Sequence, residues 1–147
     1  MRFMFSHSQT KMTRSKILLA AALLIAQGEE RFKIRFTPVP IDAAMRATVA
    51  GSGSGTATLS GNKLTINVTF EGMPSAATTA KLHKAVAAGV RGSAFLDLTV
   101  TKAEKGTVSG TLDLTPDQID NLRKGHLYIQ ISSEKAPDGT LWGWILK

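Results

Sequence analysis

The apolar and polar residues of this chain alternate in several short segments, which predicts β-strands. In residues 64–70 every second residue is apolar, so that one side carries aliphatic and aromatic side chains and the other carries threonine and asparagine. Such alternation is typical of a strand with one buried and one solvated face. Residues 55–60 precede this segment across Gly61-Asn62, a pair that favours a two-residue hairpin. The same alternation returns in residues 93–101 and 107–114.

One helix interrupts the predicted strands. Thr115 offers a hydroxyl as the N-cap, Pro116 occupies the first helical position, and Gln118 lies three residues after the cap. These residues form a capping box together with the proline that helix starts favour. Gly125 suits the position just after the helix C-terminus. We expect a short helix that is stable only when it packs on the sheet.

The last segment, residues 125–147, predicts a closing hairpin. An apolar strand over 127–131 is followed by a Pro-Asp-Gly turn and a second apolar strand. About seven short strands with turns between them indicate an all-β fold, an antiparallel Greek-key sandwich or barrel with one short helix. Residues 29–54 are less regular. Within them the glycine- and serine-rich segment 51–55 is predicted to be a flexible loop or a loose edge between strands.

Residues 1–28 are typical of a secretory signal peptide. Basic residues come first, no acidic residue occurs before Glu29, and an uninterrupted apolar run covers residues 17–26. The small residues Ala26 and Gly28 suit cleavage after either one, with Gly28 as the first choice. An apolar run of this length spans about 15 Å of helix, half a bilayer core, so no stable membrane span is expected after cleavage. The sequence therefore predicts a periplasmic or secreted protein.

The composition of the chain excludes several kinds of chemistry and partner. The chain has no cysteine, which excludes disulfides, thiolate catalysis and a cysteine-linked lipid anchor. The 18 basic residues outnumber the 11 acidic ones, but the excess is concentrated before residue 17 and the rest is spread along the chain. This weak, dispersed charge argues against nucleic acid as a partner. With few histidines and no serine in a nucleophile motif, the sequence predicts a non-catalytic protein with no cofactor.

Several segments occur in an order that resembles one protein family. These segments are residues 62–74, 80–84, 89–98, 122–131 and 137–143. In order and spacing they resemble the CHRD domain, a module widespread in exported bacterial proteins. The resemblance implies an immunoglobulin-like or Cu/Zn superoxide dismutase-like β-domain over residues 45–147, preceded by a lead-in over residues 29–44. It implies little about activity, because the biochemical role of the family is largely undefined.

The resemblance also raises the question of a metal site. Many members of the family carry a His-x-His motif of which this chain keeps only His83, and a further histidine where it has Ser132. A zinc or copper site needs three or four ligands. Here His83 and His126 would need a carboxylate such as Asp97 to complete the set. The alternative is that both histidines have structural roles.

Tyr128, Trp142 and Trp144 form the candidate binding site. The tryptophans lie two residues apart on one predicted strand, so both side chains point to the same face. Tyr128 on the facing strand would complete an aromatic patch suited to a protein or glycan partner. The alternative is that the helix or residues 29–50 cover this face and make the tryptophans part of the core.

Together these observations predict an exported, non-catalytic β-sandwich module. Its expected partners are another exported protein or an envelope glycan. One alternative is a metal-binding protein similar to Cu/Zn superoxide dismutase with His83 as its central ligand. Another is a carbohydrate-binding sandwich that uses Trp142 and Trp144.

Overall fold

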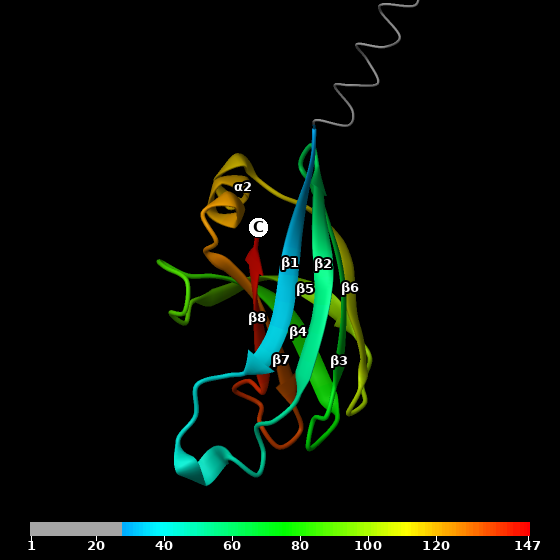
Figure 1. Ribbon diagram of the computed structural model, residues 1–147, viewed down its shortest axis with the longest axis vertical. Helices are drawn as coiled ribbons and strands as arrows, with labels where there is room; N and C mark the ends of the chain where they lie inside the picture. Colours follow the sequence, from blue (N-terminus) through cyan, green and yellow to red (C-terminus); the bar gives the residue numbers. More distant parts are fainter. Residues whose placement is uncertain (1–27) are drawn as a thin grey trace, which may run out of the picture. The chain divides into compact units, whose positions relative to one another are not determined.

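Eight strands and one short α-helix follow one another in residues 28–147, the part of the chain that the computed structural model describes (Figure 1). Residues 1–27, which hold nearly all of the predicted signal peptide, lie outside the described part. Among the described residues no helix is long and apolar enough to cross a bilayer. In chain order the elements are β1 (Glu29–Pro38), the 3-10 turn η1 (Ala43–Met45), β2 (Ser52–Ser60), β3 (Lys63–Glu71), β4 (Ala77–Lys84), β5 (Ser93–Val100), β6 (Gly106–Asp113), α2 (Pro116–Arg123), β7 (Leu127–Ser133) and β8 (Leu141–Leu146).

The strands close into an antiparallel barrel. Their order around it is β1-β2-β3-β6-β5-β4-β7-β8, and β8 returns to pair with β1. β4, β5 and β6 are successive neighbours, while β7 lies beside β4 and β3 beside β6, so the connections on either side of this group cross over the barrel. This connectivity is a Greek key. The prediction of an all-β antiparallel fold with one short helix is confirmed.

Alternating side chains from the strands fill the barrel core. In β3 the predicted alternation holds along the whole strand, with every apolar residue buried and every polar residue exposed. β1, from the less regular part of the sequence, contributes Phe32, Ile34 and Phe36 in the same way. Because inward positions repeat every second residue on each strand, the core is continuous across the barrel.

The segment 51–55 is not the loop that its composition predicted. Gly51 precedes β2, and the rest of the segment lies in that strand, in register with β3. The glycines take positions at which a side chain has no room. A Cβ atom at Gly53 would lie 2.2 Å from the carbonyl oxygen of Thr69 and 2.8 Å from Cδ2 of Phe36. Glycine is therefore required here because β2 approaches its neighbouring strands closely. From composition alone, the same glycines suggest a flexible segment.

The predicted helix start is confirmed in full. The Thr115 hydroxyl accepts a hydrogen bond from the Gln118 N–H at 3.2 Å, and the Thr115 N–H donates to Oε1 of Gln118 at 2.9 Å. Both groups of the capping box are thus satisfied, with Pro116 at the first helical position. Leu122 is buried and joins the barrel core, which anchors α2 between β6 and β7.

β5 and β6 form a short seam in the barrel. They pair at only two positions, Thr99 opposite Ser109 and Val100 opposite Val108. Leu96 and Leu98 of β5 pack against the core as expected, yet both remain half-buried. They are only half-buried because the part of β5 before Thr99 pairs with β4 alone and, within residues 28–147, has no partner strand on its other side.

Candidate functional site

The outer face of β4, β7, β8 and β1 brings the candidate residues into one row. Tyr128 lies opposite His83 on one side and opposite Trp144 on the other, and Trp144 lies opposite Arg35. Trp142 sits two residues before Trp144 on the same face of β8. The hairpin register thus places the three aromatic residues together.

These side chains form a continuous aromatic cluster. The ring of Tyr128 stacks on His83 with centroids 4.8 Å apart, and it lies 4.6 Å from the ring of Trp144. Trp142 meets Tyr128 edge-on at 5.5 Å and Trp144 edge-on at 5.4 Å. Edge-to-face and offset contacts of this kind add to the stability gained from burial alone.

Most of this cluster is covered by the connection between β1 and β2. We call residues 39–49 the flap: Val39, Ile41, Met45 and Val49 pack on the cluster, and the Val39 N–H donates to the Thr140 carbonyl at 3.1 Å. Tyr128 is 0% exposed and Trp142 is 9% exposed. Trp144 stays half-buried, as does His83, and the indole Nε1 of Trp144 is shielded without a hydrogen-bond partner. A partner could therefore reach the edge of Trp144 but little else of the aromatic patch.

Tyr128 and His83 together fix the loop between β4 and β5. The Tyr128 hydroxyl accepts from the Gly92 N–H at 2.9 Å and donates to the Gly92 carbonyl at 3.2 Å. Nδ1 of His83 lies 3.0 Å from the same carbonyl oxygen. Next to it, the Arg91 guanidinium donates to the carbonyls of Pro40 and Asp138, which ties the loop to the flap and to the β7–β8 turn. These contacts give His83 a structural role.

The structure offers the metal hypothesis no complete ligand set. The Ala85 N–H donates to the His126 carbonyl, so His126 lies just before β7, two residues before Tyr128, the residue opposite His83. Asp97 is held by Lys81 at 3.8 Å. Within residues 28–147 no group of three potential ligands comes together. The assignment of His83 and His126 as metal ligands therefore stays a prediction, with no third protein ligand beside them among residues 28–147.

Burial lowers the pKa of the His83 imidazole below its ordinary value of 6.5. The hydrogen bond to Gly92 acts in the opposite direction, and the charges of Lys81 and Arg91 lower the pKa further. The unfolded chain therefore takes up this proton at a higher pH than the folded protein does. Stability is expected to fall as the pH drops below about 6.5, because protonation then favours the unfolded state.

A pH series of urea unfolding midpoints checks this expectation. His83→Gln should flatten the dependence of stability on pH below neutrality, since the titrating ring is gone. His126→Gln, measured in parallel, controls for the loss of a histidine elsewhere. An unchanged pH dependence in His83→Gln would show that other groups cause it.

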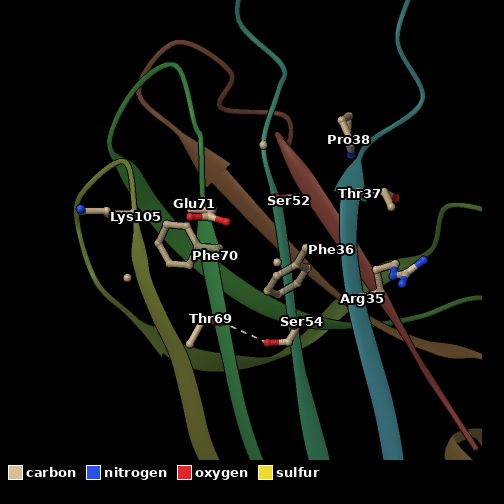
Figure 2. A pocket seen from close by; sticks show the side chains of 13 residues that line it. Arg35, Phe36, Thr37, Pro38, Ser52, Ser54, Thr69, Phe70, Glu71 and Lys105 are labelled. Carbon is tan, nitrogen blue, oxygen red and sulfur yellow. Dashed lines mark hydrogen bonds between the residues drawn. The ribbon is translucent and has the colours of Figure 1, made fainter.

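A separate groove of about 790 Å³ opens beside this row, on β1, β2 and β3 (Figure 2). Its polar lining consists of Arg35, Thr37, Ser52, Ser54, Thr69, Glu71 and Lys105. Below them lie the rings of Phe36 and Phe70, which belong to the core. Arg35 belongs both to this groove and to the aromatic row, so the two features adjoin. The groove has no sequence signature, because three successive strands and the β5–β6 turn each contribute only a few residues to its lining, and part of β2 was predicted to be a loop.

The described residues thus form a closed Greek-key β-barrel with a polar groove on β1, β2 and β3. The CHRD domain family model matches residues 38–145, and the chain belongs to the CHRD domain family. This family is one of non-enzymatic domains. No curated protein and no solved structure matches the chain.

Proposed function

We propose that this protein is an exported, non-catalytic binding module that holds an envelope or extracellular component in the groove on β1, β2 and β3. The observation that carries the proposal is the lining of the groove. It presents hydroxyl, guanidinium, carboxylate and ammonium groups side by side, and it includes no histidine or cysteine. Such walls bind by hydrogen bonds and do not assemble a nucleophile with its base.

A glycan is the ligand that these groups suit best. Ser52 and Ser54 project from the exposed face of β2, and the Thr69 hydroxyl donates to the Ser54 carbonyl at 3.3 Å. Arg35 and Glu71 add charged hydrogen-bonding groups of opposite sign, which sugar hydroxyls satisfy in either direction. Phe36 and Phe70 are buried, so they form the bottom of the groove but expose too little ring surface for a sugar to stack on. The expected ligand is therefore hydrophilic.

The carbohydrate-binding alternative that relied on Trp142 and Trp144 takes a modified form. The flap covers Trp142, but Trp144 is only half-buried and lies opposite Arg35 at the border of the groove. A sugar bound in the groove would thus have one aromatic edge within reach. Stacking would be a secondary contribution, with hydrogen bonds to the groove walls as the main one.

Binding to immobilised glycans tests the proposal. We expect the protein to bind peptidoglycan fragments or extracellular polysaccharides on a glycan array, and Arg35→Ala combined with Glu71→Ala to weaken that binding by about tenfold or more, since hydrogen bonds to charged groups contribute about 1.5–3 kcal/mol each. Lys63→Ala is the matched control, because Lys63 is exposed on β3 at the end away from the groove. Equal binding by both variants, or none by the native protein, would refute the glycan assignment.

A further inference from the structure

The loop between β4 and β5 exposes a run of apolar residues to solvent. Residues 86–90 read Val-Ala-Ala-Gly-Val, and all five are exposed. Val86 is 83% exposed and Val90 is 46% exposed, and both are among the most exposed large apolar residues described. In Figure 1 this green connection extends away from the barrel wall. We call residues 86–90 the apolar tip.

The base that carries the apolar tip is rigidly held. At one end the Ala85 N–H donates to the His126 carbonyl at 2.9 Å. At the other end Gly92 is fixed by the Tyr128 hydroxyl through both its N–H and its carbonyl. A Cβ atom at Gly92 would lie 1.9 Å from the Lys84 carbonyl oxygen, so the two ends of the loop approach each other as closely as glycine allows. Both ends of the loop are thus held in place by hydrogen bonds and close backbone contact.

Positive charge surrounds the base of the same loop. A hollow of about 630 Å³ lies beside it, lined in part by Lys84, Arg91, Lys124 and His126. Lys84 pairs with Asp117 at 3.0 Å and Lys124 with Asp120 at 2.8 Å, but both pairs are exposed and therefore weak. Arg91 donates to backbone carbonyls only and has no carboxylate partner among the described residues. Its charge remains available to an anion.

We propose that this loop docks the protein onto a lipid bilayer that carries anionic headgroups. The apolar tip enters the interfacial region, while the cations at its base meet the headgroup phosphates. A short apolar insertion or a few basic residues alone binds a bilayer weakly and reversibly, and the two contributions together bind an anionic bilayer more tightly. Anionic lipid is favoured over an apolar protein surface because the lining of the hollow beside the tip includes Lys84, Arg91 and Lys124 and, among the described residues, no carboxylate.

A single fluorescent probe in the tip tests this directly. The chain has no cysteine, so Val86→Cys introduces a unique attachment point for an environment-sensitive nitrobenzoxadiazole dye. With phosphatidylcholine vesicles that contain phosphatidylglycerol, we expect the emission to shift to shorter wavelength as the dye leaves water. Thr65→Cys, exposed on the outer face of β3, is the matched control and should show no shift. Both variants contain the N-terminal apolar run, so any membrane affinity of that run affects both equally. A difference in emission shift between the two dye positions then reports on the tip.

Charge variants complete the test. In the Val86→Cys background, Lys84→Gln combined with Lys124→Gln should raise the lipid concentration at half-maximal shift by about fivefold to thirtyfold, as expected for the loss of two cations near the surface. The near-ultraviolet circular dichroism of each variant confirms that the barrel is intact. A Val86 dye that stays in water with every vesicle overturns the proposal and points to an apolar protein partner. An equal shift with pure phosphatidylcholine overturns the role of the anionic headgroups.

Discussion

Replacing Ile129 by alanine is expected to lower the free energy of unfolding by about 2–5 kcal/mol. Ile129 is 0% exposed in the middle of β7, where it lies opposite Leu82 on one side and Gly143 on the other. Gly143 has no side chain, so the neighbouring strand cannot fill the cavity that alanine leaves. Urea unfolding followed by tryptophan fluorescence measures the loss, since Trp142 and Trp144 lie on the adjacent strand.

Leu98→Ala provides the matched comparison for Ile129→Ala. Leu98 packs against the same core but is half-buried beside the short seam between β5 and β6. Less apolar surface is lost on truncation, and solvent reaches the space, so we expect a cost below about 2 kcal/mol. Equal losses at both positions would mean that the seam is as closely packed as the rest of the barrel.

Replacing Gly53 by valine should destabilise the barrel by about 3 kcal/mol or more, because the first carbon of any side chain already meets backbone atoms. Its Cβ would lie 2.2 Å from the Thr69 carbonyl oxygen, 2.8 Å from the Phe36 ring and 3.0 Å from Cα of Phe70. To make room, β2 must move away from its neighbours, which separates the strands on the side that holds the groove.

The control for Gly53→Val is the same substitution one residue further on. Ser54 points outward and is exposed, so Ser54→Val keeps the strand and even raises its β-propensity. Its unfolding free energy should stay within about 0.5 kcal/mol of the native value. If both valines were tolerated equally, the close approach at Gly53 would be relaxed easily and glycine would not be required there.

The regular strands and the helix start could be predicted because their signals are local. The alternation in 64–70 and the capping box from Thr115 to Gln118 depend on neighbouring residues only. β4, over Ala77–Lys84, carries a weaker strand signal, because its alternation is broken at its start, where the register with β7 shifts between Ala77 and Thr79. β2 was missed at its start because glycine was required for close packing at a position where composition suggested flexibility.

Only part of the candidate site could be predicted from the sequence. The common face of Tyr128, Trp142 and Trp144 follows from strand geometry and hairpin register. What covers that face depends on the flap, a proline-interrupted segment with no periodicity whose Val39 and Val49 meet residues about a hundred positions away. The groove has the same character, since β1, β2 and β3 each contribute a few polar residues that carry no common motif.

Closure of the barrel by β1 with β8 has a consequence for the order of assembly. The partners that complete the wall, such as Ile34 opposite Ile145 and Phe36 opposite Gly143, are separated by almost the whole described chain. A chain lacking its last strand would leave one edge of β1 and one of β7 unpaired, with Phe32 and its neighbours uncovered. Pairing over such a sequence distance requires a long loop to close before the contacts form, which slows folding. The wall of the barrel is therefore complete only once β8 has been synthesised and can pair with β1.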